Sequence, residues 1–444
     1  MKAIIRNTVI IPHGVIRLIS LVSLLIVQVS AYGQKLVPSS DPANVGVSED
    51  QLSLIDEFIT EYIDNEIVPG GTFLIARRGE IVYNKSFGHT NLNKTRAYAN
   101  DDIYRLASMT KAVTSVAIMQ LVEKGKLRLN DPIKYYLPAF AEPVVLQYLN
   151  ADSSFTTIPS NGDITIRHLL SHTSGIGYGD FDPERLGVVY SQFGVMNVGL
   201  SHKEMTTKEL VDKIAKVPLS FHPGEKYLYG LNMDVLGRIV EVVSGMELDE
   251  YFKKNIFDPL GMKDTWFYLP ESHHDRLVDI YTLDDQRKWI MAPEESSAMI
   301  EYPLRADNNH YAGGGGLSGS TMDYARFIQA LMNNGAYNGH RILSRKSIET
   351  IATDQLALLG VDHSNYSQVP GMTMGLGFGV TMDAAEGHNL TSVGSYYWGG
   401  MFNTKYFIDP QEELIFVGMT QIVPFIRPDF WDRLTNIIYS SLTD

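Results

Sequence analysis

The sequence predicts a mixed α/β protein in which a strand-rich unit, built from both ends of the chain, carries a largely helical insertion. Residues 71–87 contain two runs rich in β-branched and aromatic residues around an Arg-Gly-Glu turn, which is typical of a hairpin. Residues 405–419 have the same pattern around a second turn. Between the two hairpins, apolar residues recur mainly at helical spacing, so the middle of the chain is expected to be helical.

The first 33 residues have the features of an export signal. Three basic residues precede the apolar run 18–29, and the small residues Ala31 and Gly33 follow it, as at a cleavage site. The run is shorter than the ~20 residues of a membrane-spanning helix. We therefore expect an exported protein, periplasmic or secreted, with no stable membrane insertion after signal removal; a retained signal anchor is the alternative.

Composition excludes several classes of partner and chemistry. The chain has 444 residues, 44% of them hydrophobic, and a formal net charge of −14, which becomes −17 without residues 1–33. Nucleic-acid binding depends on basic residues that neutralise phosphates, so no nucleic-acid partner is expected. The chain contains no cysteine, which excludes disulfides, a thiol nucleophile and a lipid-anchored N-terminal cysteine.

The folded part is expected to begin at Ser48. Residues 34–47 are rich in proline, serine and aspartate and predict a flexible lead-in. Ser48 opens a Ser-x-x-Gln capping box ahead of apolar residues at helical spacing. The resulting domain boundaries are 48–110 and 300–444 for an α/β sheet domain, and 111–299 for a mainly helical domain.

The stretch Ser108-Met109-Thr110-Lys111 places a hydroxyl and an amine three residues apart at the start of an apolar helical segment. Residues at this spacing share a helix face, so Ser108 and Lys111 can form a hydrogen bond at the helix N-terminus. The free N–H groups there favour a developing oxyanion. Burial can keep a lysine partly neutral, and such an amine can take the proton of a serine. The alternative is a surface serine and lysine, because this spacing arises about once by chance in such a chain.

A tyrosine motif and a glycine motif accompany the serine. The tyrosine motif stands ahead of a predicted helix and reads Pro223-Gly224-Glu225-Lys226-Tyr227-Leu228-Tyr229-Gly230. Either of its tyrosines can transfer the serine proton to a leaving group. The alternative is that the tyrosines have only a packing role.

Trp398-Gly399-Gly400-Met401 precedes the C-terminal hairpin. Its glycines permit close backbone approach to a ligand, where an N–H completes an oxyanion hole; a bulge or turn is the alternative.

Three further patterns give weaker evidence about function. The four glycines 313–316 lack a following Gly-Lys-Ser/Thr and predict a flexible turn rather than a phosphate site. His168 and His172 have metal-ligand spacing if both lie on a helix, but no third ligand is evident, and no metal is expected. No Gly-x-Ser-x-Gly pentapeptide occurs, which argues against a Ser-His-Asp hydrolase.

The order of Ser-x-x-Lys, a tyrosine motif and a glycine motif before a C-terminal strand resembles the family of serine β-lactamases and penicillin-binding proteins. The resemblance covers about residues 48–440 and includes the stretches 104–111, 166–175 and 259–262. Within the family the chain is most similar to the class C branch, and there to class VIII carboxylesterases, whose third motif commonly reads Trp-Gly-Gly.

This resemblance implies a fold and a set of roles. The fold is an antiparallel sheet from both chain ends flanked by helices, with an all-helical insertion domain and the site between them. Ser108 is implied as the nucleophile, Lys111 as its activator and Tyr229 as the acid–base partner. The N–H groups of Ser108 and Met401 form the oxyanion hole, Tyr227 is structural, and no cofactor is needed.

The chain also departs from the class C pattern at positions that contact substrate. Trp398, which with Gly399 and Gly400 lines the substrate site, replaces a lysine that holds the carboxylate of a β-lactam. Leu231 replaces an asparagine that contacts the substrate amide, and Asn232 stands next to it. Both changes favour an uncharged ester as substrate.

We therefore expect an exported serine hydrolase that cleaves small-molecule esters through an acyl-enzyme on Ser108. One alternative is a β-lactamase or D-amino-acid peptidase that acts on β-lactam or peptidoglycan amides. Another, from a different class, is a non-catalytic binding protein of the cell envelope. The natural substrate, acyl-chain length and oligomeric state are left open by the sequence.

Overall fold

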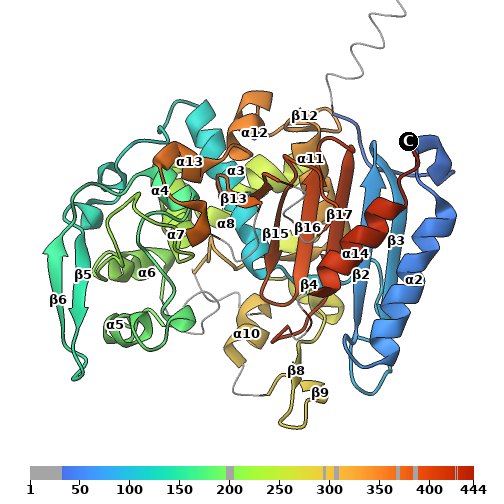
Figure 1. Ribbon diagram of the computed structural model, residues 1–444, viewed down its shortest axis with the longest axis horizontal. Helices are drawn as coiled ribbons and strands as arrows, with labels where there is room; N and C mark the ends of the chain where they lie inside the picture. Colours follow the sequence, from blue (N-terminus) through green and yellow to red (C-terminus); the bar gives the residue numbers. More distant parts are fainter. Residues whose placement is uncertain are drawn as a thin grey trace, which may run out of the picture.

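The computed structural model describes residues 33–196, 205–293, 297–304, 310–366, 371–383, 389–425, 427 and 429–444. Within these residues the main sheet has eight strands in the order β1-β3-β2-β17-β16-β15-β14-β13 (Figure 1). Their bounds are β1 Val37–Pro38, β2 Gly70–Arg77, β3 Glu80–Gly88, β13 Met372–Met374, β14 Gly379–Thr381, β15 Tyr396–Gly400, β16 Thr404–Asp409 and β17 Leu414–Met419. Neighbouring strands are antiparallel except β1 and β3. The middle of the sheet, β2 beside β17, thus joins the two ends of the chain.

The central strands are apolar on both faces because both faces are covered. In β2, Phe73 and Ile75 belong to one hydrophobic core, whereas Leu74 and Ala76 belong to the other. This alternation follows from the period of two residues along a strand. Sequence runs without polar alternation, such as β2 and β17, are therefore expected in the middle of this sheet.

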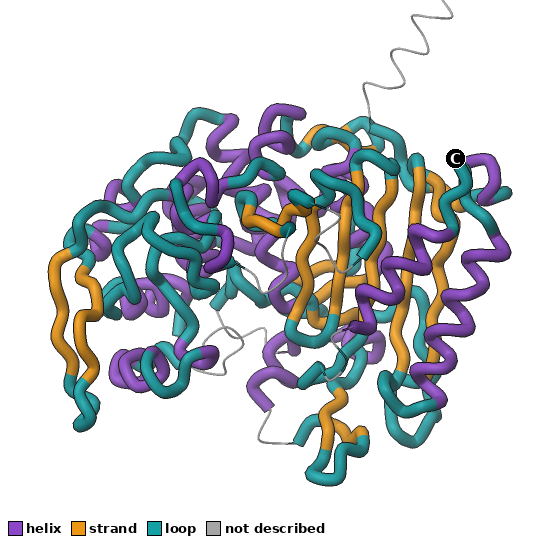
Figure 2. The backbone as a smooth tube through the Cα atoms, in the orientation of Figure 1, coloured by secondary structure: helices purple, strands orange, loops and turns teal. Residues whose placement is uncertain are grey.

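Helices from both chain ends cover one face of the sheet, and a helix from the C-terminal half covers the other. Helices α2 (Glu49–Asp64) and α14 (Asp429–Ser440) lie side by side on the first face, as Figures 1 and 2 show. The N-cap of α2 is Ser48, whose hydroxyl accepts from the N–H of Gln51 at 3.3 Å. Helix α11 (Thr321–Met332) packs on β17, β16 and β2 from the opposite side.

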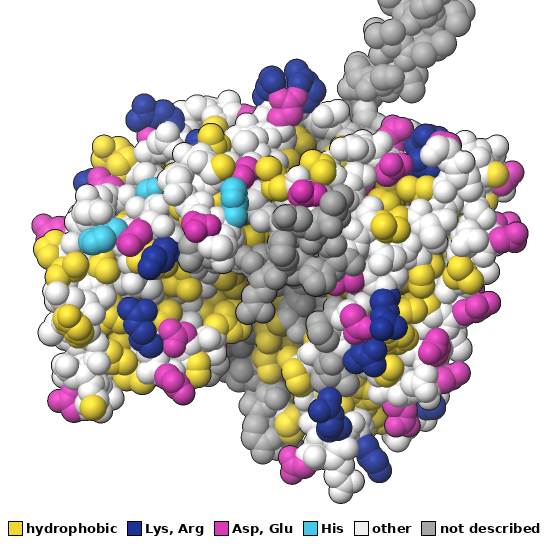
Figure 3. Space-filling view, in the orientation of Figure 1, with side chains coloured by type: hydrophobic (Ala, Val, Ile, Leu, Met, Phe, Trp, Pro, Cys, Tyr) yellow, Lys and Arg dark blue, Asp and Glu magenta, His cyan; other side chains and the backbone are white. Residues whose placement is uncertain are grey.

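The second part of the molecule is built around helix α3 (Thr110–Glu123), in which Thr110 to Leu121 are all buried. Helix α7 (Asn232–Ser244) packs against it. The other helices are α4 Ile166–Leu170, α5 Leu186–Phe193, α6 Thr207–Ile214, α8 Leu248–Phe252, α9 Asp258–Leu260, α10 Ser297–Glu301, α12 Arg345–Ile351 and α13 Gln355–Leu359. The surface is hollowed between this part and the sheet in the view of Figure 3.

Short strands complete the fold. One small sheet consists of β4 Ile103–Arg105, β10 Ser318–Ser320 and β7 Thr265–Trp266. Three pairs are β5 Val144–Leu149 with β6 Phe155–Pro159, β8 Tyr281–Leu283 with β9 Trp289–Met291, and β11 Ala336–Tyr337 with β12 His340–Arg341. The strand β4 leads directly into the segment that carries Ser108.

The mixed α/β fold with an antiparallel-dominated sheet from both chain ends, predicted from the sequence, is confirmed. The insertion is not helical throughout, because β5 and β6 form a hairpin in it. Residues 34–47, expected to be a flexible lead-in, instead contact the sheet: Val37 pairs with Glu80, and Asp41 caps a 3-10 turn, Pro42–Val45. The predicted signal lies outside the described residues apart from Gly33. None of the described helices combines the length and apolarity that a bilayer crossing requires.

Candidate active site

Ser108 lies in a 3-10 turn, Ala107–Met109, that runs into helix α3. Its side chain is half-buried, while Ala107 and Met109 on either side are buried. Ala107 has φ +44°, in the left-handed region that residues other than glycine rarely adopt. Such strain is held in place by its surroundings and clusters at functional sites. The turn thus presents Ser108 at the N-terminus of a buried helix, as the sequence predicted.

Lys111 is buried, with 1% of its surface exposed, and its ammonium has three hydrogen-bond acceptors. Nζ donates to Oγ of Ser108 at 3.1 Å, to the carbonyl of Gly314 at 2.6 Å and to the hydroxyl of Tyr178 at 3.3 Å. An ammonium group has three N–H donors, so this set uses all of them. The amine is therefore held in one orientation, with one of its three bonds directed at the serine.

Tyr229 provides the second hydrogen bond to the serine. Its hydroxyl donates to Oγ of Ser108 at 2.7 Å, and its ring lies 4.7 Å from Nζ of Lys111. Tyr227, the other tyrosine of the motif, packs edge-on against Tyr366 with 4.9 Å between ring centroids. Of the two tyrosines that the sequence left open, the structure brings Tyr229 to the serine.

The end of strand β15 lies against the backbone that precedes the serine. A Cβ on Gly400 would lie 2.4 Å from the carbonyl oxygen of Leu106, so only glycine fits there without a shift. Ala107 and Phe402, the neighbours of Ser108 and Met401, share one small hydrophobic cluster. The two residues whose N–H groups were predicted to form an oxyanion hole therefore lie on adjoining backbone segments.

Aromatic side chains lie around the ring of Tyr229. Its ring is 5.7 Å from Trp398, 5.4 Å from Tyr178 and 6.1 Å from Phe181, centroid to centroid. Phe181 is 70% exposed, which is unusual for so large an apolar side chain, and Met401 is 47% exposed. The site thus has an apolar, partly open rim that includes Trp398, one of the predicted substrate-site residues.

Asn232 does not take the place of the missing asparagine of the motif. It is fully buried, and its amide is used inside the protein: Nδ2 donates to Nδ1 of His172 at 2.9 Å and to the carbonyl of Ile176 at 3.2 Å, and Oδ1 accepts from Ser174. Leu231, at the family position, is also buried. The polar contact to a substrate amide is therefore not restored by the neighbouring residue.

The sequence pattern did not predict the groups that contact Lys111 on the side away from Ser108. The glycines 313–316 were interpreted as a flexible turn, yet the carbonyl of Gly314 binds Lys111, and a Cβ there would lie 2.6 Å from Oδ2 of Asp234. The N–H of Gly314 donates to the buried carboxylate of Asp234 at 3.1 Å. Burial raises the pKa of Asp234, and the positive charge of Lys111 partly offsets this. The absence of a phosphate-loop motif gave no hint of this packing role.

Tyr178 was missed as well. It lies in a loop without periodic sequence pattern, 67 positions from the lysine that it contacts. Burial raises its pKa well above the usual value of a tyrosine, so its hydroxyl stays protonated. It therefore serves Lys111 as a neutral acceptor.

The two histidines with metal-ligand spacing do not share a helix face. His168 lies in α4, where Nδ1 accepts from the N–H of Thr165 at 3.3 Å, whereas His172 lies beyond the end of that helix with φ +55°. In both residues Nδ1 is occupied by a hydrogen bond within the protein. The condition for a helical ligand pair, that both histidines lie on one helix, is therefore not met.

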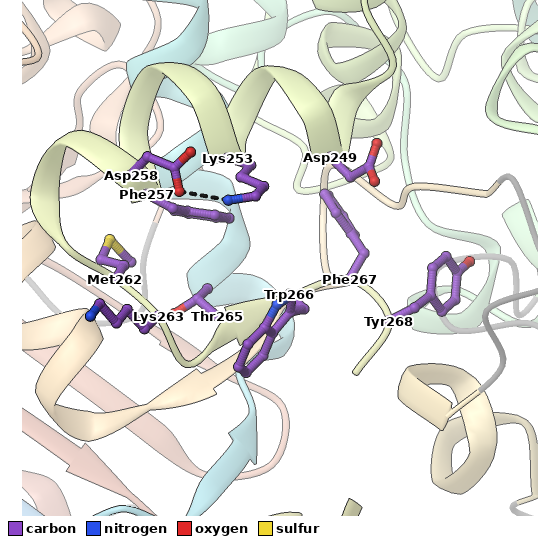
Figure 4. Close-up of a pocket in the computed structure, with 10 residues that line it drawn as sticks. All are labelled: Asp249, Lys253, Phe257, Asp258, Met262, Lys263, Thr265, Trp266, Phe267 and Tyr268. Atoms are coloured by element: carbon purple, nitrogen blue, oxygen red, sulfur yellow. Dashed lines mark hydrogen bonds and ion pairs between the residues drawn. The ribbon is translucent and has the colours of Figure 1, made fainter. Parts of the chain in front are cut away.

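A surface cavity of about 260 Å³ lies outside this cluster (Figure 4). It is lined by Asp249, Lys253, Phe257, Asp258, Met262, Lys263, Thr265, Trp266, Phe267 and Tyr268. Lys253 and Asp258 form an ion pair of 2.7 Å at its wall, and both are largely exposed. Neither Ser108 nor its partners line this cavity, so it is not the candidate active site.

Comparison with known proteins agrees with the fold. A family model described as Beta-lactamase matches residues 55–434. The chain belongs to the β-lactamase family, which confirms the resemblance seen in its motifs.

Relatives with assigned activities include esterases and acyltransferases. Esterase EstB of Burkholderia gladioli is 29% identical over 381 residues, which cover 84% of this chain and 91% of EstB. Lovastatin esterase of Penicillium rubens is 30% identical over 367 residues, which cover 78% of this chain and 86% of that enzyme. Among solved structures, EstCE1, described as a hydrolase with promiscuous acyltransferase activity, has a TM-score of 0.74 and 24% identity over 88% of this chain and 98% of its own. The protein is accordingly a serine hydrolase.

Proposed function

We propose that this protein is an exported carboxylesterase, similar to the class VIII carboxylesterases, which cleaves uncharged esters through an acyl-enzyme on Ser108. One observation carries the proposal: Oγ of Ser108 accepts hydrogen bonds from both Tyr229, at 2.7 Å, and Lys111, at 3.1 Å. A serine becomes a nucleophile when an adjacent group takes its proton. Both partners are at the distance that such a transfer requires.

In the first step, Oγ of Ser108 attacks the ester carbonyl carbon. The reactive form of the enzyme is one in which the pair of Tyr229 and Lys111 has lost one of the protons that it donates toward Ser108, so that the pair can accept the serine proton. The N–H groups of Ser108 and Met401 stabilise the oxyanion. The pair then delivers the proton to the alkoxy oxygen, the C–O bond breaks, and the alcohol leaves.

In the second step, a water molecule attacks the acyl-enzyme. The same pair takes one proton from the water and returns it to Oγ of Ser108 as the carbon–serine bond breaks. The products are a carboxylic acid and the free enzyme, so each turnover consumes one ester and one water.

The preference for an uncharged ester rests on what surrounds the serine. Trp398 stands where a class C β-lactamase has a cation, and the side chains around Tyr229 are aromatic. The amide of Asn232 is used by His172, Ser174 and Ile176. A carboxylate or a peptide amide therefore has few partners here, whereas an apolar acyl or alkyl group has many.

Two further observations support the proposal. The relatives EstB and lovastatin esterase are named as esterases, and each aligns with more than three quarters of this chain. The basic and apolar pattern of residues 1–33 supports export to the periplasm or the medium.

The test compares kcat/KM for a short-chain nitrophenyl ester with kcat/KM for a chromogenic cephalosporin. We expect the ester to be turned over at least about tenfold more efficiently, and Ser108→Ala to abolish its turnover. A higher kcat/KM on the cephalosporin would instead support the β-lactamase alternative.

A fluorophosphonate, which labels activated serines covalently, tests the nucleophile separately. We expect the wild type to be labelled and Ser108→Ala not to be. Equal labelling of both forms would place the nucleophile elsewhere, and labelling of neither would favour a non-catalytic binding protein.

A further inference from the structure

We propose that His172 is a positioning residue for Tyr229, which fixes the phenol at the serine without touching the substrate itself. The proposal rests on the proposed function in one respect: Tyr229 is taken as the proton-transfer group of ester cleavage. The sequence suggested for His172 only a metal-ligand spacing, which does not explain the contacts that it makes.

His172 is held in an unusual conformation at the centre of the protein. It follows helix α4, has φ +55° and is 0% exposed. A histidine in the left-handed region is uncommon, and one without solvent contact is rarer still. Its neighbours Ser171, Thr173 and Ser174 are also buried, so the whole segment is surrounded by other parts of the chain.

The contacts of His172 lie on both sides of Tyr229 in the sequence. Its carbonyl accepts from the N–H of Leu228 at 2.8 Å, and its Nδ1 accepts from the N–H of Gly230 at 3.4 Å. Its ring lies 4.8 Å from the Tyr229 ring, centroid to centroid, at 49° between the planes. The residue before Tyr229, the residue after it and the phenol ring are thus all held by one side chain and its own backbone.

Asn232 fixes the protonation state of the imidazole. Its Nδ2 donates to Nδ1 of His172 at 2.9 Å, so Nδ1 is an acceptor and the proton of the neutral ring is on Nε2. The orientation of the Asn232 amide is set in turn by Ser174 and Ile176. Burial, and next the positive charge of Lys111, lower the pKa of His172, which agrees with a neutral ring.

A shift of the Tyr229 hydroxyl by even a fraction of its 2.7 Å hydrogen bond to Ser108 alters proton transfer. Misplacement of a reacting group by about 1 Å can cost about a hundredfold in rate. Loss of the Nδ1 acceptor of His172 is therefore expected to lower kcat. KM depends on the apolar rim of the site, which His172 does not form, so KM should change little.

Two substitutions distinguish the effect of the Nδ1 hydrogen-bond acceptor of His172 from the effect of its ring. His172→Asn keeps an acceptor near the position of Nδ1, and asparagine tolerates the left-handed backbone. His172→Phe keeps a ring but leaves Asn232 and the N–H of Gly230 without an acceptor. For nitrophenyl ester hydrolysis, we expect kcat to fall about tenfold in His172→Asn and about hundredfold in His172→Phe, with KM within about threefold of wild type.

The matched control is His168→Asn, in the same segment, where Nδ1 accepts from Thr165 and not from the Tyr229 loop. We expect this variant to retain kcat within about twofold. Circular dichroism and thermal unfolding show whether each variant is folded, and kcat is compared among folded variants. If His172→Asn loses as much kcat as His172→Phe, or if His168→Asn loses as much as either, the positioning role is overturned.

A double-mutant cycle with Tyr229→Phe tests whether His172 acts through the phenol. The readout is the rate at which a fluorophosphonate labels Ser108, which remains measurable over hours in slow variants. We expect His172→Phe to slow labelling about tenfold or more in the wild-type background, but less than about twofold in the Tyr229→Phe background. An equal reduction in both backgrounds would show that the effect does not pass through Tyr229.

Nitrogen chemical shifts of the imidazole give a signature that does not depend on activity. We expect wild-type His172 to show Nε2 protonated and Nδ1 unprotonated. A protonated Nδ1 contradicts the proposal. If instead wild type lacks esterase activity while His172 has this tautomer, the proposed function fails and the structural part of this inference stands.

Discussion

Lys111 donates a 2.6 Å hydrogen bond to the carbonyl of Gly314, and this bond connects the active-site amine to a buried carboxylate. The N–H of Gly314 donates in turn to Asp234 at 3.1 Å. The backbone of one residue, Gly314, therefore provides an acceptor for the cation through its carbonyl and a donor for the anion through its N–H. Because both charged groups are buried, each reduces the cost of burying the other.

The first prediction follows from this connection. Lys111→Met should lower kcat for a nitrophenyl ester by more than about a hundredfold, because it removes a proton-transfer partner of Ser108. It should also lower the free energy of unfolding at pH 7 by about 1–3 kcal/mol, because Asp234 loses its nearby positive charge. Urea unfolding measures this, and Lys111→Met combined with Asp234→Asn should recover part of the stability. A Lys111→Met variant as stable as wild type would contradict the electrostatic connection.

The second prediction concerns Gly400. Alanine here places a Cβ 2.4 Å from the carbonyl of Leu106, so strand β15 must move away from the turn that carries Ser108. Since the proposed oxyanion donors lie on these two segments, kcat should fall about tenfold to a thousandfold with a small change in KM. The control is Gly162→Ala, whose Cβ would meet nothing within 4 Å. Equal kinetics for the two variants would place the oxyanion hole elsewhere.

The third prediction concerns Trp398, whose ring lies 5.7 Å from that of Tyr229. Trp398→Lys introduces a cation at the position where class C β-lactamases have one. Relative to a neutral ester, kcat/KM for a substrate with a carboxylate should rise about tenfold, since a hydrogen bond to a charged group contributes about 1.5–3 kcal/mol. Trp398→Gln, which is polar but uncharged, separates charge from size. The same gain with glutamine would rule out charge as the cause.

The fourth prediction is a pH dependence of stability. Burial lowers the pKa of His168 to about 4, from about 6.5 in the unfolded chain. Between these values the unfolded chain binds a proton that the folded protein does not, so unfolding becomes easier as pH falls. Stability should fall by up to about 1.4 kcal/mol per pH unit from this histidine. Urea unfolding at pH 7, 6 and 5 should show a shallower loss in His168→Asn. A loss of the same steepness in the variant would exclude His168 as its source.

The hairpins of the sheet were predictable from the sequence because their signals are local. Residues 71–87 and 405–419 combine β-rich runs with turns, and the structure places β2, β3, β16 and β17 there. The proximity of Ser108 and Lys111 was predictable for the same reason, because a helical turn fixes the distance between residues three apart.

The rest of the site depends on contacts that no local pattern encodes. Tyr227 and Tyr229 are two positions apart in a loop, and only packing against Tyr366 and Ser108 separates their roles. Tyr178 meets Lys111 from a loop, and Gly314 contributes a backbone carbonyl, whose direction no side chain reveals. The family resemblance pointed to Tyr229, which the structure places beside Ser108, but carried no information on Tyr178 or Gly314.

The pairing of β2 with β17 has a consequence for biosynthesis. Arg77 bonds to Glu412, 335 positions later, and the segment after β15 that carries the proposed oxyanion donor Met401 belongs to the same late part of the chain. Contacts so distant in sequence form slowly and only after both partners exist. A nascent chain on the ribosome therefore contains Ser108 and Lys111 early, but the central sheet that supports them has not yet formed. Hydrolytic activity becomes possible only when translation is nearly complete.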